Sequence, residues 1–247
     1  MILALLQARM SSRRLPGKVL APVLDEPMIV HQIRRIRRAT KIDRLVVATS
    51  DQPSDDHLAQ VCEQSQAMLF RGSLDDVLDR CYQAALPHRP DHIVRLTADC
   101  PLIDPAIIDE VCACHLAGGY DYTSNVQQRS FPDGLDVEIC RFGALEQAWR
   151  QARTPPEREH VTLYLRSGDF RIGHLVGQPN LSHHRWTVDY DDDLDLVRRI
   201  YGALYPRNPN FTMSDVLRFL NDHPYLGVHG PRHGSTSAAP SDDVGAK

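Results

Sequence analysis

The chain has 247 residues, of which 42% are hydrophobic and 24% are charged. This balance is typical of a folded globular protein with one large domain or two small ones, and it excludes a chain that is disordered throughout. The formal net charge of −4 argues against a nucleic-acid-binding protein, because such proteins carry a strongly basic surface.

The N-terminal run and the cysteines indicate the cellular compartment of the protein. Met1 leads directly into the apolar run Ile2–Leu6 without a basic leader, so we interpret the run as a buried strand rather than a signal peptide. No apolar run approaches the roughly 18 residues of a membrane span, so we expect no membrane segment. The six cysteines are scattered and form no Cys-x-x-Cys pair. We therefore predict reduced thiols and a cytoplasmic protein.

Apolar runs and helical patterns alternate through the first half of the chain. The predicted strands are Ile2–Leu6, Leu45–Thr49, Met68–Phe70 and His92–Leu96. The predicted helices are Met28–Arg38, Asp55–Gln64, Asp75–Leu86 and Pro105–Ala117. This alternation predicts an α/β fold with a mostly parallel sheet and helices on both faces. In such sheets ligands bind beyond the carboxyl ends of the strands.

The second half is less regular, and we interpret it as an extension of the same sheet with a small subdomain that covers the substrate or forms a dimer. The predicted strands are Tyr120–Asn125, Val137–Cys140 and Phe170–Val176. The predicted helices are Gly143–Arg153, Glu157–Arg166, Asp192–Leu204 and Ser214–Asn221. Gly230–Lys247 is rich in Gly, Ser, Pro and Ala, which predicts a disordered tail.

The loop Gln7–Lys18 follows the first predicted strand and carries three arginines, a lysine and two serines. Arg9 and Arg14 can bind phosphate oxygens with paired hydrogen bonds, and Lys18 adds a point charge. The loop matches neither a Walker A nor a Rossmann glycine pattern. A solvated basic loop is the alternative, but the position between a strand and a helix favours phosphate binding.

Two aspartates follow short apolar runs in different parts of the chain. Asp99 comes after His92–Thr97, and Asp189 ends the segment Trp-Thr-Val-Asp. Magnesium binds through one or two carboxylates together with phosphate oxygens and water, so this pair predicts a Mg²⁺ site. A turn residue at a strand end is the alternative for Asp99. Asp104 and the run Asp191–Asp193 stand where helices begin, and we interpret them as caps.

Three segments carry a recognisable combination of motifs. Residues 8–18 read Ala-Arg-x-x-Ser-x-Arg-Leu-Pro-Gly-Lys, residues 95–104 read Arg-Leu-Thr-Ala-Asp-Cys-Pro-Leu-Ile-Asp, and residues 131–138 read Phe-Pro-Asp-Gly-Leu-Asp-Val-Glu. This combination resembles the sugar-acid cytidylyltransferases, which include CMP-Kdo synthetase and N-acylneuraminate cytidylyltransferase. Gln7 replaces that family's usual proline, a departure shared by the branch called spore coat polysaccharide biosynthesis protein F. The resemblance extends over residues 1–226.

The resemblance implies a Rossmann-like sheet of the GT-A nucleotidyltransferase type, within one domain over residues 1–229. Residues 1–118 would bind nucleotide, and residues 119–229 would bind sugar and form a homodimer. Nucleotide contacts are implied at Ala8, Arg9, Ser12, Arg14, Lys18, Thr49, Ser50, Arg71, Gly72, Ser73, Thr97 and Ala98. Catalytic groups are implied at Arg14, Lys18 and Asp99, and Mg²⁺ on Asp99 and Asp189.

The acceptor sugar is assigned to residues of the second half. These are Asn125, Asp136, Glu138, Glu159 and His160. Asp136 and Glu138 share a face if their segment is extended. The alternatives are a solvent-facing strand residue for Glu138 and an ordinary helix surface for Glu159 and His160.

Together the motifs predict a magnesium-dependent enzyme that transfers CMP from CTP to a sugar or sugar acid, releases pyrophosphate and serves surface polysaccharide synthesis. Kdo, a nonulosonic acid, another sugar and a phosphonate all stay open as acceptors. A glycosyltransferase is one alternative, because Asp191–Asp193 formally contains an Asp-x-Asp motif. A non-catalytic nucleotide-binding scaffold is another. No nucleic-acid partner is expected, since the cluster Arg34–Arg38 is interpreted as the solvated face of an amphipathic helix.

Overall fold

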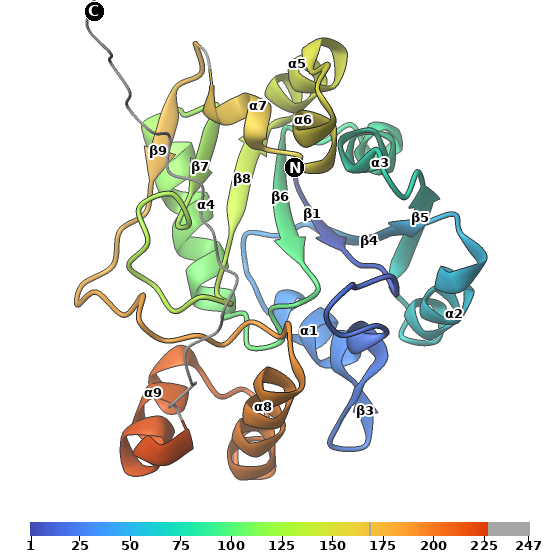
Figure 1. Cartoon of the computed structure of the whole chain (residues 1–247). Coiled ribbons are helices and arrows are strands. Elements are labelled where there is room, and N and C mark those ends of the chain that lie inside the picture. The colour runs from blue at the N-terminus through green and yellow to red at the C-terminus, as the bar shows by residue number, and fades with distance from the viewer. Residues whose placement is uncertain (168, 227–247) are drawn as a thin grey trace, which may run out of the picture.

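A seven-stranded sheet runs through the protein, whose computed structural model describes residues 1–167 and 169–226 (Figure 1). The strands are β1 Ile2–Gln7, β4 Arg44–Ser50, β5 Met68–Gly72, β6 His92–Thr97, β7 Tyr122–Ser124, β8 Glu138–Arg141 and β9 Ile172–His174. Their order in the sheet is β5-β4-β1-β6-β8-β7-β9. A separate two-stranded ribbon, β2 Pro22–Val23 with β3 Glu26–Pro27, was not predicted, since two-residue strands leave no periodicity. The predicted tail Gly230–Lys247 lies outside the described residues.

Strand β8 is the one strand of this sheet that runs against the others. β1, β4, β5 and β6 pair in parallel, and so do β7 and β9. β8 is antiparallel to both β6 and β7. The reversal pairs Arg95, near the carboxyl end of β6, with Glu138, the first residue of β8. The chain therefore enters β8 at the edge of the sheet where the parallel strands end.

Side chains of β1 alternate between two hydrophobic cores, as the strand period of two requires. Ala4 and Leu6 belong to one core, and Leu3 and Leu5 to the other. Each fully buried Leu contributes about 1.5–3 kcal/mol by leaving water. A strand buried on both faces is typical of a parallel sheet covered by two helical layers.

Helices cover both faces of the sheet (Figure 1). One core receives side chains from α1 Met28–Ile36, α2 Asp56–Gln64, α4 Pro105–Gly118, α8 Asp191–Leu204 and α9 Met213–Asp222. The other receives them from α3 Val77–Ala85, α5 Phe142–Gln151 and α7 Leu163–Arg166, and α6 Pro155–Glu159 packs on α3. Short 3₁₀ turns lie at Lys18–Leu20, Pro53–Asp55, Leu86–His88 and Pro224–Leu226. The predicted α/β class is confirmed. Within the described ranges, no helix combines the length and apolar character that a membrane crossing needs.

Local signals explain where α4 begins and ends. The Asp104 side chain accepts a hydrogen bond of 2.9 Å from the backbone N–H of Ala106, and Pro105 occupies the first helical position. Both features are favourable at a helix N-terminus. The helix ends at Gly118 and is followed by Gly119, which has a φ of 60°, a left-handed conformation that glycine adopts without strain. The predicted cap at Asp104 is therefore confirmed.

Two interpretations of helices are wrong. The predicted helix Glu157–Arg166 is divided into α6 and α7, because His160 leaves the helical conformation with φ −98° and ψ 73°. The break turns Val161 and Thr162 toward the buried interior. The cluster Arg34–Arg38 is not wholly solvated, since Arg35 is buried.

Arg35 stays buried because its guanidinium finds partners in the interior. It donates to the carbonyl oxygens of Ile103 at 2.7 Å and Leu102 at 3.3 Å. It also lies 4.4 Å from the ring centroid of Phe211. A buried charge with such partners escapes much of the penalty for leaving water. This contact fixes the loop that follows β6 against α1.

Candidate active site

A cleft of about 500 Å³ opens where β1 and β6 end. Its lining combines the basic loop with the ends of both strands, α6 and Asp189. The polar lining residues are Gln7, Arg9, Ser12, Arg13, Arg14, Lys18, Arg95, Thr97, Asp99, Glu159, His160 and Asp189. A hollow of about 950 Å³ lies at the other edge of the sheet, beside Asp91 and Arg141, and contains none of the predicted site residues. The 500 Å³ cleft is the better candidate, because α/β sheets bind ligands at the carboxyl ends of their strands.

Backbone contacts hold the basic loop open around this cleft. The N–H of Met10 donates to the Asp55 carboxylate at 2.8 Å, and the N–H of Gly17 donates to the Met10 carbonyl at 2.9 Å. Gly17 has a φ of 75°, which favours glycine. Arg13 and Arg14 lie on the exposed part of the loop, where their guanidinium groups can reach an anionic ligand.

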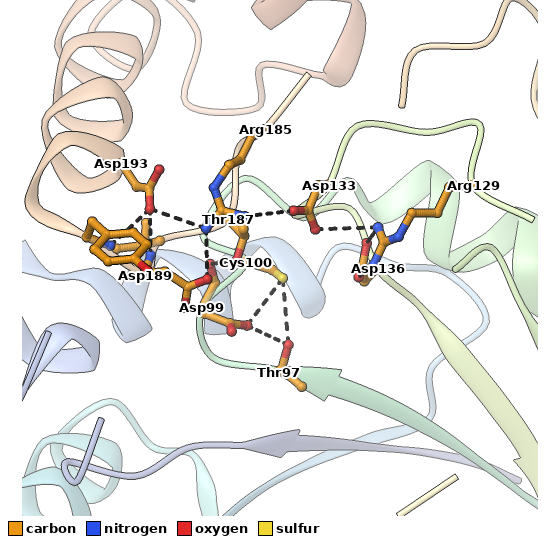
Figure 2. Close-up of polar contacts among 12 residues, drawn as sticks. Thr97, Asp99, Cys100, Arg129, Asp133, Asp136, Arg185, Thr187, Asp189 and Asp193 are labelled. Atoms are coloured by element: carbon orange, nitrogen blue, oxygen red, sulfur yellow. Dashed lines mark hydrogen bonds and ion pairs between the residues drawn. The ribbon is translucent and has the colours of Figure 1, made fainter. Parts of the chain in front are cut away.

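Lys18 lies between the two aspartates that the sequence singled out. Its Nζ is 3.0 Å from Asp189 Oδ1 and 3.7 Å from Asp99 Oδ2. It also donates to the carbonyl oxygen of Val188 at 2.6 Å. The backbone N–H of Val188 donates to the Asp99 carbonyl at 2.8 Å. Backbone hydrogen bonds and the charge of Lys18 thus join the segment of Asp99 to the segment of Asp189. The two aspartates lie close together (Figure 2).

Asp189 is surrounded by cations. Besides Lys18, its Oδ1 pairs with Arg14 at 2.7 Å, and its Oδ2 pairs with Arg185 at 2.8 Å. Burial raises the pKa of Asp189, but the charge of Lys18 and the hydrogen bond from Arg185 outweigh burial and lower it. The carboxylate is therefore held in its charged form, which is the form that binds a metal ion.

Asp99 is oriented by its own strand end. Thr97 Oγ1 donates to Asp99 Oδ1 at 2.6 Å, so Oδ2 is the oxygen that lies toward Lys18. Thr97 and Ala98 also line the cleft. Burial raises the pKa of the neighbouring Cys100 thiol, which makes it a poor nucleophile.

The donor set fits a magnesium ion that arrives with a phosphate ligand. Among residues 1–167 and 169–226, no group of three His, Cys, Asp or Glu side chains is arranged to hold a metal alone. Asp99 and Asp189 supply two carboxylates, and the cationic loop beside them can hold phosphate. Mg²⁺ is bound in this way, through one or two carboxylates plus substrate phosphates and water.

The nucleotide residues predicted at the ends of β4 and β5 lie outside the cleft. Thr49 and Ser50 are buried, and their hydroxyl groups donate to Asp55 at 2.9 Å and 2.5 Å. Arg71 donates to the carbonyl oxygen of Ser50 at 3.0 Å, and Gly72 accepts a backbone hydrogen bond from the N–H of Asp51 at 2.8 Å. Thr49 and Ser50 thus hold the carboxylate of Asp55, which contacts the basic loop at Met10. Their contact with a nucleotide stays a prediction.

A second hollow, of about 480 Å³, adjoins the cleft and shares its walls at Arg9, Arg13 and Glu159. It extends over the first residues after Ser73, beside Asp76. Ser73 itself accepts a hydrogen bond from the N–H of Asp76 at 3.0 Å. The two hollows together offer room for a ligand larger than a triphosphate.

The predicted sugar residues divide into two groups. Glu159 and His160 are exposed and line the cleft. Asn125, Asp136 and Glu138 do not line it. The Asn125 amide bridges the chain, donating to Leu135 O at 2.8 Å and accepting from Val137 N–H at 2.8 Å. Asp136 pairs with Arg129 at 3.0 Å.

Glu138 is the centre of a buried network. Arg95 pairs with its Oε2, while Arg166 at 2.8 Å, Thr162 at 2.7 Å and Tyr122 donate to Oε1. Burial raises the pKa of Glu138, but the two guanidinium groups and the hydroxyl donors outweigh it and lower the pKa to about 2. The alternative of a solvent-facing strand residue is therefore wrong.

Several functional residues were missed from the sequence. Gln7 and Arg95 line the cleft, and Gln7 Oε1 accepts from Arg95 Nη2 at 3.0 Å. A charged residue near the carboxyl end of an apolar strand was the available signal for Arg95. Asp55 and Arg185 hold the loop and Asp189 in place. Their long-range contacts leave no local pattern that the sequence could reveal.

Comparison with known proteins identifies relatives of this chain. The family model described as cytidylyltransferase matches residues 3–195. The chain is 34% identical over 232 residues to the spore coat polysaccharide biosynthesis protein SpsF of Bacillus subtilis, covering 90% of this chain and 95% of that protein. It is 36% identical over 109 residues to a 3-deoxy-manno-octulosonate cytidylyltransferase of Trichlorobacter lovleyi, covering 44% of this chain and 42% of that enzyme. The solved structure of a cytidylyltransferase from Leptospira borgpetersenii has a TM-score of 0.88 at 30% identity, covering 94% of this chain and 99% of that one.

Proposed function

Because the chain belongs to the cytidylyltransferase family, and is therefore a nucleotidyltransferase, we propose that it transfers CMP from CTP to a sugar or sugar acid with Mg²⁺ as cofactor. The observation that carries this proposal is the position of Lys18, whose ammonium group lies between Asp99 and Asp189 in the cleft. Phosphate-binding cations and metal-binding carboxylates meet there, as transfer of a nucleotidyl group requires.

In the proposed reaction the acceptor hydroxyl group loses its proton to water, and its oxygen bonds to the α-phosphorus of CTP. The bond from that phosphorus to its bridging oxygen breaks, and the electron pair leaves with pyrophosphate. Arg14 and Lys18 would stabilise the negative charge of the leaving group. Asp99 and Asp189 would hold Mg²⁺, which neutralises charge on the phosphates when bound. Glu159 and His160, across the cleft, would contact the acceptor.

The ion pairs around Asp189 support an exchange of partners when substrate binds. Arg14 and Lys18 both pair with Asp189 Oδ1. A triphosphate offers these cations better-matched partners, since guanidinium and ammonium groups bind phosphate strongly. The Arg14 side chain is 51% exposed and that of Lys18 is 9% exposed, so Arg14 is the freer of the two to turn to a ligand. Their departure would leave Asp189 Oδ1 available to the cation.

The two alternatives drawn from the sequence lose support. A glycosyltransferase would need the Asp-x-Asp run to face the substrate, but Asp191–Asp193 forms the first turn of α8. Asp193 is buried and accepts from the N–H groups of Asp189 and Tyr190, at 2.9 Å each. A scaffold without activity would not need Lys18 and both aspartates at one point. A homodimer and a cytoplasmic location stay predictions, and the identity of the acceptor stays open.

The experiment compares D99N and D189N with the parent enzyme. Pyrophosphate release from CTP is measured with Mg²⁺ against a panel of sugar acids and neutral sugars, and calorimetry measures CTP binding with and without Mn²⁺. We expect each variant to lose at least a hundredfold in kcat/KM and to lose the metal-dependent part of CTP binding. D195N is the control, because Asp195 is exposed on α8 and pairs with Arg198. If both variants released pyrophosphate at the rate of the parent enzyme, the metal assignment would be disproved.

A further inference from the structure

The turn that precedes β8 packs directly on the segment that carries Asp189. The backbone N–H of Asp133 donates to the carbonyl oxygen of His184 at 2.9 Å, and the N–H of Trp186 donates to the Asp133 carbonyl at 2.6 Å. Gly134, with a φ of 109°, lies so close that a Cβ there would be 2.5 Å from the backbone nitrogen of Thr187. The motif Pro-Asp-Gly-Leu-Asp, predicted to contact sugar, therefore braces the Asp189 segment.

Arg185 joins this turn to Asp189 through the two arms of its guanidinium group (Figure 2). Nη1 donates to Asp133 Oδ2 at 3.0 Å, and Nη2 donates to Asp189 Oδ2 at 2.8 Å. Nη2 also lies 3.4 Å from Asp193 Oδ2. A planar fork can hold two carboxylates at fixed angles, whereas a lysine ammonium group cannot. Arg185 thus fixes the side chain of Asp189 relative to two other elements.

The two oxygens of Asp189 have different surroundings. Oδ1 pairs with Lys18 and Arg14, which both line the cleft. Oδ2 pairs with Arg185, which does not line it. The ion pair with Asp133 keeps Arg185 on the side of Asp189 that faces away from the cleft. Only one oxygen of Asp189 is therefore turned toward the cleft.

We propose that Arg185 is a positioning residue that holds Asp189 by its outer oxygen, with Asp133 as its anchor, so that Asp189 presents a single oxygen to the cation. This inference rests on the proposed function, which makes Asp189 a metal ligand. It has a consequence for metal choice. Mg²⁺ requires near-ideal octahedral geometry, whereas Ca²⁺ accepts carboxylates through both oxygens and tolerates irregular sites. Arg185 thereby favours Mg²⁺ over Ca²⁺.

The test uses R185Q, R185K and D133N in the full chain, with Mn²⁺ and CTP as probes. Mn²⁺ binding in the presence of CTP is followed by electron paramagnetic resonance, and competition by Mg²⁺ and Ca²⁺ gives the preference between them. We expect R185Q to weaken Mn²⁺ binding about tenfold, as loss of a residue that orients a metal ligand does, and to reduce the Mg²⁺ preference. R185K and D133N should also weaken Mn²⁺ binding and reduce the Mg²⁺ preference, but by less than R185Q does.

Controls separate a positioning role from general damage. R198Q removes a comparable arginine on α8, which pairs with Asp195 at 3.2 Å, and should leave Mn²⁺ binding and metal preference unchanged. CTP binding without metal should stay within twofold of the parent in all variants. If R185Q does not fold, as judged by thermal unfolding, R185K and D133N give the decision. If the folded variants bound Mn²⁺ as tightly as the parent and kept its preference for Mg²⁺ over Ca²⁺, the inference would be overturned.

D189N distinguishes this inference from the proposed function. If D189N weakens Mn²⁺ binding while R185Q, R185K and D133N do not, only the positioning role fails. If D189N itself binds Mn²⁺ as the parent does, the metal assignment fails and the positioning role fails with it. A double variant of Arg185 and Asp133 should lose less than the sum of the single losses, because the two side chains act through one contact.

Discussion

The carboxylate of Asp55 accepts a hydrogen bond of 2.8 Å from the backbone N–H of Met10, 45 residues earlier in the chain. The other oxygen of Asp55 accepts from Thr49 and Ser50. One carboxylate therefore joins the end of β4 to the middle of the basic loop. Hydrogen bonding outweighs burial and lowers the pKa of Asp55, so it stays charged.

Replacing Asp55 with Asn should loosen the loop. An amide nitrogen facing the hydroxyl and N–H donors cannot accept their hydrogen bonds, which leaves buried donors without a partner at a cost of about 1–3 kcal/mol each. We expect the free energy of unfolding to fall by about 2 kcal/mol and CTP affinity to fall with it. Urea unfolding and calorimetry measure both. D56N, at a residue 65% exposed on its side chain, should change stability by less than about 1 kcal/mol; an equal loss in both variants would contradict the role of Asp55.

Replacing Lys18 with Met should have opposite effects on the metal and the nucleotide. The variant removes the cation shared by Asp99 and Asp189, so the two carboxylates repel each other and attract a free cation more strongly. We expect tighter binding of Mn²⁺ alone, but a loss of about 10²–10³-fold in kcat/KM because the leaving pyrophosphate loses a charge partner. K41M, at an exposed lysine, is the control. Weaker Mn²⁺ binding by K18M would show that Lys18 does not compete with the metal.

Gly134 should tolerate no side chain. A Cβ would lie 2.5 Å from the nitrogen of Thr187 and 2.6 Å from the carbonyl carbon of Trp186, at a φ of 109°. Both contacts are backbone, so relief requires the two segments to separate. We expect G134A to lower the free energy of unfolding by at least about 3 kcal/mol, measured by urea unfolding. Gly202 lies on helix α8, and a Cβ added there would meet no atom within 4 Å among the described residues outside its own stretch of helix. G202A should therefore stabilise the fold by about 0.5–1 kcal/mol.

Acid should destabilise the fold in two separate pH ranges. Burial lowers the pKa of His115 from 6.5 to about 4, so the unfolded chain binds its proton first and stability falls as the pH drops from 6.5 to about 4. Burial raises the pKa of Glu138, but Arg95 and Arg166 outweigh it and lower the pKa from 4.5 to about 2. Its contribution is complete above pH 4.5 and is lost as the pH falls to about 2.

Urea unfolding across this pH range checks the assignment. In H115Q the free energy of unfolding should depend less on pH between pH 6.5 and about 4, because the titrating group is gone. Below that range the free energy of unfolding should still fall with pH in H115Q, since Glu138 causes that part of the dependence. An unchanged slope in H115Q would assign the first range to other groups, such as His92, which lies 3.1 Å from His115.

The elements of the first half could be predicted because apolar runs there are short and sharply bounded. Their ends were harder to place. β4 and β5 extend through polar residues, pairing Thr49 with Arg71 and Ser50 with Gly72. Backbone pairing is indifferent to side-chain polarity, so the predicted strands ended too early, at Thr49 in β4 and at Phe70 in β5. Ser50, Arg71 and Gly72 therefore lie within strands of the sheet, and their contact with a nucleotide stays a prediction.

The meeting of Lys18 and Asp99 could be predicted because the basic loop follows β1 and Asp99 follows β6, and strand ends of a parallel sheet share an edge. Asp189 was expected to follow a short strand, but among the described residues no strand lies between β9 and α8, and contacts with Lys18 and the Asp99 backbone hold the segment there instead. Charge pairs between residues far apart in the sequence could not be predicted. Glu138 stands in an apolar context that signals burial, but its partner Arg95 is 43 residues away. Arg185 and Asp133 lie 52 residues apart. Such pairs depend on the three-dimensional path of the chain, which a single sequence does not specify.

The reversed direction of β8 offers a practical insertion point. The segment 126–130 leads toward β8 at the edge that holds the cleft, and its Gln127 and Gln128 are exposed. A longer segment grafted there would lie at the edge of the sheet where the parallel strands end, while those strands keep their register. Insertions at this point would therefore leave the loop around Lys18 intact.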